Sequence, residues 1–291
     1  MRPAVKRALH WGGSALAIAG IVFVALRLRD YGAKLDFARF DLTAWSLVAA
    51  LALIYGLSNL MLALAWRNLL GQFGASTSRR WAVRVYGISQ IAKYVPGNIF
   101  HLAGRQAMGM AAGLAGWPLA KSAVWELGLI SATGGLFGLL ALPLLVPGLP
   151  VMASAGLFAA SIGIAVILLL RFIGLPAARA FGWYVGFLVI SALLFVGLVE
   201  LLADNPVAGV GFWLPLGGAY VLAWLIGLVT PGAPAGVGVR ELVLLFLLKG
   251  AVGEADLLLA VVMGRMVTVA GDLGFFGVSI LMNGKMDNAA R

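Results

Sequence analysis

Eight ionisable side chains lie inside long apolar stretches of the sequence. Basic and acidic residues are equal in number: Lys93, Arg105, Arg240 and Arg265, and Glu126, Glu200, Glu241 and Asp272. If these stretches cross a membrane, each charge costs about 3 kcal/mol or more, so such groups are expected to face an interior cavity and to pair. For each residue we therefore consider two roles, mutual pairing and binding of a ligand.

Two of the arginines follow a Pro-Gly pair at the same distance. Arg105 comes nine residues after Pro96, and Arg240 comes nine residues after Pro231. Proline removes a backbone donor and glycine loosens a helix, so each pair is expected to end one helix and to precede a new half-helix. The free amides and the positive dipole at the start of a half-helix favour an anion. Because arginine offers a bidentate fork, we expect a phosphate or carboxylate group to bind there.

The predicted anion site also includes Lys93, just before the first break, and the glycines after the second break, which let a ligand approach the backbone closely. The glycine-rich stretch lacks the Lys-Ser/Thr of a nucleotide-binding P-loop and follows no strand, so it does not predict a nucleotide. The full predicted headgroup-binding set is Lys93, Pro96, Gly97, Arg105, Pro231, Gly232, Gly236, Gly238 and Arg240.

Four further residues, Glu126, Glu241, Arg265 and Asp272, are predicted to pair or to couple transport to an ion. Arg265 and Asp272 are expected to pair with each other, because seven residues is almost two helical turns and places both on one face. Glu126 and Glu241 are candidates to carry protons. Glu200 lies one turn from the end of its segment, so we expect it to reach the membrane interface.

Residues for catalysis or metal binding are scarce. The chain has no cysteine, and His10 and His101 are its only histidines, so no metal site is expected. The sequence holds no Ser/His/Asp grouping, no HExxH motif and no aspartate-rich cation motif. We therefore expect neither a cofactor nor the active site of an enzyme.

The composition indicates a membrane protein. Of the 291 residues, 62% are hydrophobic and 11% are charged, with a mean hydropathy of +1.02, whereas about a quarter of an ordinary soluble domain is charged. The net charge of +10 comes from short basic clusters beside apolar segments. Such clusters mark cytoplasmic loops, so we expect a multi-pass protein of the cytoplasmic (inner) membrane and no binding to nucleic acid.

Six apolar segments are long enough to span a bilayer, for which about 20 residues are needed. The first of them is expected to be an uncleaved span and not a signal peptide. Two other segments, 82–113 and 208–249, are each interrupted in the middle by a Pro-Gly pair. The predicted spans are residues 10–26, 43–65, 118–145, 151–170, 182–202 and 257–283.

The two broken segments predict an internal repeat. Besides the Pro-Gly and arginine spacing, the Gly-Leu-Phe-Gly at 135–138 matches the Gly-Phe-Phe-Gly at 274–277. Residues 1–145 would form a first repeat of two spans, a re-entrant hairpin and a span, and residues 146–291 a second repeat of inverted topology. The alternative is about eight spans, two of them kinked at the Pro-Gly pairs.

Loop charges distinguish these two topologies. Basic residues put the N-terminus, the loop after the second span and the C-terminus in the cytoplasm. The re-entrant topology also puts Arg171 and Arg179 in the cytoplasm, as the charge rule favours, whereas two kinked spans would place them outside. We therefore expect an all-α polytopic protein with about six full spans and two re-entrant broken-helix hairpins.

Several of these motifs resemble the lysylphosphatidylglycerol synthase transmembrane-region family. The resemblance rests on Lys93-Tyr-Val-Pro-Gly97, Arg105, Trp125-Glu126, the stretch from Pro231 to Glu241, and Arg265. It implies a role in handling membrane lipids, since in long members a membrane region of this kind moves aminoacylated phosphatidylglycerol across the bilayer. A separate soluble domain makes that lipid; this chain stops at residue 291 without one, so we expect no synthase activity. The family pattern also has an arginine directly after the glutamate, where this chain has Leu127.

Three functions fit these features. The first is a flippase-like translocase for a lipid with an anionic or zwitterionic headgroup, such as a modified phospholipid or a polyprenyl-phosphate lipid. The second is a membrane enzyme or enzyme subunit that acts on a lipid-linked sugar or isoprenoid lipid, and the third is a small-solute transporter. We expect the first, with a membrane lipid as substrate and a separate lipid-modifying enzyme as a partner.

Overall fold

The computed structural model describes residues 41–95, 99–202, 210–230 and 238–282, and every regular element in these ranges is a helix. Six of the helices are long and apolar enough to cross a membrane, which confirms the all-α polytopic class. These are α2 (Leu42–Gln72), α5 (Gly116–Leu145), α6 (Val151–Phe172), α7 (Leu175–Leu202), α8 (Val210–Val229) and α10 (Glu254–Leu281).

Five of the predicted spans correspond to α2, α5, α6, α7 and α10, and the predicted span 10–26 lies outside the described residues. The helices run past the apolar segments in places. For example, α2 continues through Arg67 and Asn68 to Gln72, where Arg67 Nε donates to the Thr77 carbonyl and Asn68 Nδ2 to the Leu64 carbonyl. Both polar side chains therefore have partners within the protein.

The broken segments form shorter helices. Residues 82–113 fall into α3 (Arg79–Gln90), the 3₁₀ turn η2 (Ile91–Tyr94) and α4 (Phe100–Ala111), and α8 is followed by α9 (Val239–Leu247). At 1.5 Å per residue α3 and α4 are about 18 Å long and α9 about 14 Å, too short for a hydrocarbon core of about 30 Å. By length and composition, α8 alone among these helices is long enough to cross.

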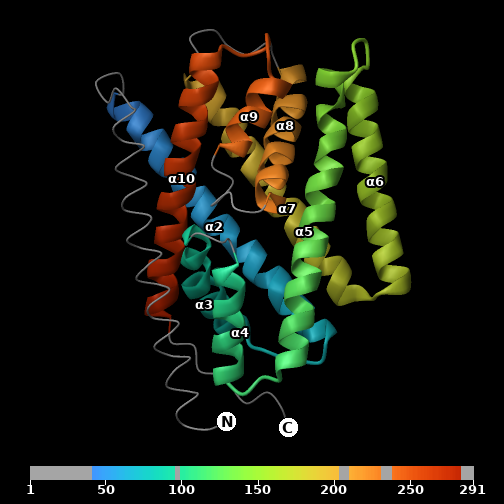
Figure 1. The fold of residues 1–291 in the computed structure, drawn as a ribbon, viewed down its shortest axis with the longest axis vertical. Helices are drawn as coiled ribbons and strands as arrows, with labels where there is room; N and C mark the ends of the chain where they lie inside the picture. Colours follow the sequence, from blue (N-terminus) through green and yellow to red (C-terminus); the bar gives the residue numbers. More distant parts are fainter. Residues whose placement is uncertain (1–40, 96–98, 203–209, 231–237, 283–291) are drawn as a thin grey trace.

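The two halves interlock. The first-half helix α3 packs against α10 of the second half, and the second-half helix α8 packs against α5 of the first. Two of the short helices also pack on the span that follows them, α4 on α5 and α9 on α10. In Figure 1, α3 and α4 lie in the lower half of the view and α8 and α9 in the upper half, with α2 crossing diagonally between them. The buried apolar residues of nearly all these helices form one core.

Polar contacts show which helix ends lie together. Gln72, at the end of α2, donates from Nε2 to the carbonyl of Ile173 in the α6–α7 connection at 3.0 Å. Trp213, near the start of α8, donates from Nε1 to Glu200, near the end of α7, at 2.9 Å. The end of α2 therefore lies beside the α6–α7 connection, and the start of α8 beside the end of α7.

The crossing of α2 and α10 depends on two glycines. A Cβ atom added to Gly271 would lie 2.6 Å from the Ala52 carbonyl oxygen and 2.8 Å from the backbone nitrogen of Gly56. A Cβ on Gly56 would lie 2.9 Å from the Gly271 carbonyl oxygen. Small residues let membrane helices approach to backbone contact. This contact holds α10, and with it Asp272, against α2.

We predict that Gly271→Ala destabilises the fold. The added methyl meets backbone atoms that cannot rotate away, and overpacking of this kind costs about 1–3 kcal/mol. The matched control is Gly274→Ala on the same helix, where an added Cβ meets nothing within 4 Å. Thermal unfolding in detergent should show a lower midpoint for Gly271→Ala and an unchanged or higher one for Gly274→Ala. Equal midpoints for the two variants would mean that the α2–α10 crossing is not tight.

Candidate functional site

Arg105 forms a buried ion pair with Glu126. Its Nη1 donates to both carboxylate oxygens of Glu126, at 2.9 Å and 2.7 Å, and the two side chains are 1% and 6% exposed. The hydroxyl of Tyr86 donates to the same carboxylate at 3.1 Å. The Arg105 guanidinium lies 4.1 Å from the Tyr86 ring centroid and 5.6 Å from that of Trp66. The pair ties α4 to α5 inside an aromatic shell.

Arg265 forms the corresponding pair in the second half with Glu241. Both Nε and Nη2 of Arg265 lie 2.9 Å from Oε1 of Glu241, and the side chains are 7% and 22% exposed. The other carboxylate oxygen accepts from the backbone amide of Gly238 at 2.8 Å, at the start of α9. The pair ties α9 to α10 as the first pair ties α4 to α5.

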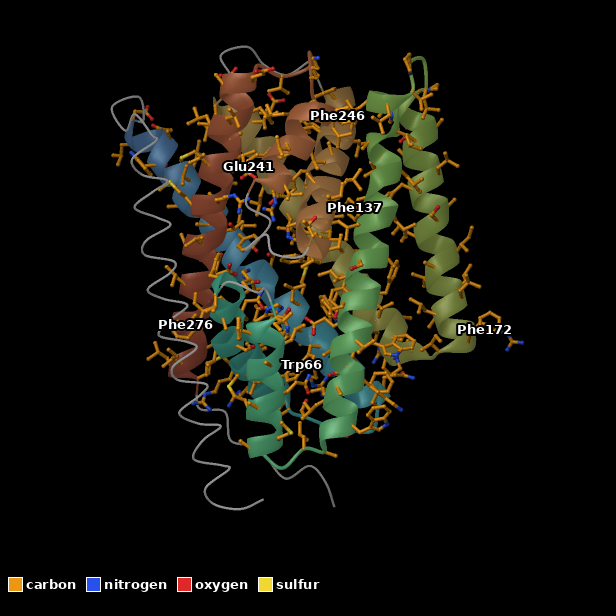
Figure 2. The ribbon with its side chains drawn as sticks, viewed as in Figure 1. Trp66, Phe137, Phe172, Glu241, Phe246 and Phe276 are labelled. Atoms are coloured by element: carbon orange, nitrogen blue, oxygen red, sulfur yellow. The ribbon has the colours of Figure 1, made fainter. Side chains whose placement is uncertain are left out.

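The members of the two pairs on α5 and α10 occupy related positions with opposite charges. The glycines of the Gly-x-Phe-Gly motifs, Gly135 and Gly274, are 139 residues apart, and the same offset relates Glu126 to Arg265. The first half therefore has an acid on its last span where the second half has a base, and α9 carries both a base, Arg240, and an acid, Glu241. Figure 2 shows Trp66 of the first cluster and Glu241 of the second in the lower and upper halves of one view.

A third ion pair joins Lys93 of η2 to Asp272 of α10, with 2.7 Å between Nζ and Oδ2. Tyr94 donates its hydroxyl to the same oxygen at 2.5 Å, and Asn59 of α2 donates from Nδ2 to Oδ1 at 3.1 Å. The Lys93 ammonium also lies 6.0 Å from the ring centroid of Tyr55 and 5.3 Å from that of Tyr94. Asp272 is thus the point where η2, α2 and α10 meet.

The predicted pair of Arg265 and Asp272 is wrong. Arg265 binds Glu241 and Asp272 binds Lys93, and among the described residues no ion pair joins Arg265 to Asp272. They share a helix, but seven residues at 1.5 Å each separate them by about 10 Å along its axis. Each therefore reaches a different broken segment, which is nearer than its neighbour two turns away.

Arg240 differs from the other three intramembrane cations because no described carboxylate lies within ion-pair distance of it. Its guanidinium lies 5.8 Å from the ring centroid of Tyr220, which stacks on Phe195 at 4.4 Å. Its Nε is buried and has no hydrogen-bond partner among the described residues. At the position related to Glu126 the second half carries Arg265, which pairs with Glu241. Within the part of the chain that the structure describes, the half-helix α9 thus retains an unneutralised cation.

A small cavity lies beside Arg240, between α2, α7, α8 and α10. Tyr55 and Tyr220 line it together with Ser191 and Thr268 and with apolar residues of α7 and α10. Arg240 sits over the ring of Tyr220, and Lys93 lies on the side of Tyr55. The two tyrosines thus connect one cation from each half to one cavity.

The other predicted site residues are distributed differently. No described contact joins Arg105 to Arg240, and Arg105 belongs to the Glu126 cluster. Gly238 has a φ of 85°, a backbone conformation that favours glycine, at the start of α9. The remaining predicted residues, Pro96, Gly97, Pro231, Gly232 and Gly236, lie outside the described residues.

Sequence reasoning missed the tyrosines of the site. Each half-helix arginine lies over a tyrosine ring of an earlier helix. Arg105 lies over Tyr86 of α3, 19 residues upstream, and Arg240 lies over Tyr220 of α8, 20 residues upstream. That recurring spacing is a signal that the sequence already carried. Asn59, by contrast, reaches Asp272 across 213 residues and follows no repeat.

No protein-family model matches the chain, and no curated protein matches it. The resemblance to the lysylphosphatidylglycerol synthase transmembrane-region family therefore stays a prediction. The assignment of a function rests instead on the geometry of the charged residues.

We predict that a double-mutant cycle separates the true partner of Arg265 from the false one. Arg265→Gln combined with Glu241→Gln should show a coupling of about 0.5–3 kcal/mol, because each single variant strands a charge and the double one does not. Arg265→Gln combined with Asp272→Asn should be additive. The measurement is the midpoint of unfolding in detergent for the singles and doubles. Coupling only in the Asp272 cycle would contradict the pairing of Arg265 with Glu241.

Proposed function

We propose that this membrane protein is a lipid translocase that moves a lipid with an anionic headgroup, and that Arg240 binds the headgroup. The observation that carries the proposal is the state of Arg240, a partly buried guanidinium with an unpartnered Nε and no described carboxylate beside it. An uncompensated charge in a low-dielectric interior costs several kcal/mol. An anion bound at the guanidinium would supply the missing charge.

The charge balance of the interior supports this assignment. Glu126, Glu241 and Asp272 each neutralise one cation, so among Lys93, Arg105, Arg240 and Arg265 it is Arg240 that has no described carboxylate as a partner. Phosphate suits an arginine because the planar guanidinium can donate two parallel hydrogen bonds to it. Arg105, which the sequence analysis also assigned to the headgroup, is neutralised by Glu126, so we assign it a structural role.

Re-entrant broken helices would give such a headgroup a polar route. The contact between Gln72 and Ile173 puts the end of α2 and the α6–α7 connection at one end of the bundle. Because α5 and α6 are both long enough to span, α5 starts at that same end, and the chain between α2 and α5 would leave and return on one side. The short α4 and α9 fit this course, and broken helices at membrane depth are typical of transporter sites.

The resemblance noted in the sequence supports a lipid as the cargo, since members of that family handle membrane lipids. A translocase needs no catalytic residues, which agrees with a sequence that has no catalytic motif. Conversion of the lipid by the purified protein would favour an enzyme instead.

We predict that single cysteines at Ser76 and Phe172 are labelled from the same side of the membrane, the cytoplasmic one. Ser76 follows α2, Phe172 ends α6, and both are exposed. A cysteine at Val146, at the other end of α6, should be labelled from outside. The chain has no native cysteine, so background labelling is absent. Kinked spans in place of hairpins would put Ser76 and Phe172 on opposite sides of the membrane. Labelling of the two cysteines from opposite sides would therefore contradict the re-entrant topology.

We predict that Arg240→Gln slows translocation of a fluorescent anionic phospholipid in liposomes by about tenfold or more, because a hydrogen bond to a charged group contributes about 1.5–3 kcal/mol. Arg240→Lys keeps the positive charge but loses the bidentate guanidinium. Its translocation rate should therefore lie between those of the parental protein and Arg240→Gln. Arg171→Gln, at an exposed arginine near the end of α6, is the control and should transport at the parental rate.

Folded yield must be measured beside transport. Arg240 has no described carboxylate to strand, so Arg240→Gln should fold as well as the parent, whereas Arg105→Gln strands Glu126 and should reduce yield. A well-folded Arg240→Gln protein that moves lipid at the parental rate would rule out Arg240 as the headgroup site.

A further inference from the structure

The Lys93–Asp272 pair differs from the other two in how its partners are buried. The Lys93 side chain is 19% exposed whereas the Asp272 side chain is 0% exposed. In the Arg105–Glu126 pair neither partner exceeds 6%, and in the Arg265–Glu241 pair two nitrogens of the arginine hold one oxygen. The Lys93 side chain is thus a partly exposed cation that holds Asp272 through one nitrogen. The Asp272 carboxylate that it holds is fully buried.

Lys93 and Arg240 each lie against a tyrosine that lines one cavity, although neither residue lines the cavity itself. The Lys93 ammonium faces the ring of Tyr55, and Tyr55 and Tyr220 line the same cavity. An anion attracted by Arg240 would therefore lie near a second cation already held by Asp272. Lysine is a compact charge on a long stem, so it can move to a new partner without displacing the helix that carries it.

If Lys93 moves to the anion, Asp272 remains buried without a cation. Removing one partner of a buried pair leaves an uncompensated charge, which is strongly unfavourable as long as the stranded charge persists. Protonation ends that cost, because a neutral carboxyl group donates a hydrogen bond and carries no charge. The Tyr94 hydroxyl and the Asn59 amide stay in place as hydrogen-bond partners for the neutral acid.

We propose that Asp272 is a proton site coupled to anion binding. The anion takes the ammonium of Lys93, a proton from water binds Oδ2 of Asp272, and the net charge of the interior is the same as before. When the anion leaves, Lys93 returns and the proton is released. Anion and proton therefore cross together, and a proton gradient can drive the transport. This inference rests on the proposed function, because it needs an anion at Arg240.

Among the described residues, Lys93 is the cation that forms an ion pair with Asp272. Tyr94 on η2 and Tyr55 on α2 are the neighbouring phenols. On α10 itself Arg265 is held by Glu241 of α9, next to Arg240. Gly87 of α3 contacts α10, and Gly264 of α10 lies beside Phe195 and Leu198 of α7; these residues carry no charge.

The two halves differ at the positions of this ion pair. The 139-residue offset places Thr133 of α5 at the position related to Asp272, and its hydroxyl donates to the Leu129 carbonyl of its own helix. The 135-residue offset between the two arginines places Leu228 at the position related to Lys93. The first half has no aspartate and the second half no lysine at these related positions. The proposed exchange therefore involves one proton site and not two.

The experiment is calorimetric titration of the protein in phosphatidylcholine nanodiscs with short-chain dihexanoyl phosphatidylglycerol, in buffers of different ionisation enthalpy. The dependence of the heat on the buffer gives the protons bound. We expect the parental protein to take up about one proton per anion bound. Asp272→Asn should bind the anion with no proton uptake and with an affinity that no longer falls as pH rises. Glu254→Gln, an exposed acid on the same helix, should keep the uptake.

Lys93→Met supplies an independent check, since Asp272 then lacks its cation before the anion arrives. That variant should bind more weakly and take up no proton. If Asp272→Asn fails to fold because it strands Lys93, the Lys93→Met/Asp272→Asn double variant, which strands no charge, must also show no uptake.

The outcomes separate the two proposals. Binding by the parental protein without proton uptake, or uptake that persists in the Asp272 variants, overturns the proton site and leaves the anion site standing. No binding by the parental protein overturns the anion site, and the proton coupling with it.

Discussion

The cost of a charge in a medium without water constrains this structure more than any other factor. In a membrane bundle apolar packing is only a weak source of specificity, because lipid tails are as apolar as leucine. An ion pair specifies its partner, because the alternative is a stranded charge. Each of the three pairs joins a broken segment to a long span, α4 to α5, α9 to α10 and η2 to α10. The half-helices are too short to be positioned by spanning, and these contacts position them.

The charges of Glu126 and Arg265, at positions 139 residues apart, account for the lack of a described carboxylate beside Arg240. Where the first half has Glu126, the second has Arg265, so the partner of Arg265 must come from α9, and Glu241 provides it. Arg240, beside Glu241 in sequence, then has no acid on the following span at the related position.

Aromatic rings surround the two half-helix arginines. Trp66 and Tyr86 surround Arg105, while Tyr220, stacked on Phe195, lies beside Arg240. A ring face attracts a cation without neutralising it, so the guanidinium of Arg240 remains able to bind an anion. The tyrosines at positions 55 and 220 further relate two cations from different halves through one cavity. None of these rings was assigned to the site from the sequence, because an aromatic residue in an apolar segment does not stand out.

The sequence by itself determined the class of the fold and five of its spans, because apolar length is a local property that a bilayer reads directly. It also singled out every residue of the three ion pairs, since a charge in an apolar run stands out wherever it lies. It could not assign the partners. Arg265 and Asp272 share a helical face, yet each binds a different broken segment, and Asn59 reaches Asp272 from 213 residues away. Which opposite charge lies nearest depends on how the helices cross, and the close approach of α2 and α10 at Gly56 and Gly271 sets that distance only in the folded protein.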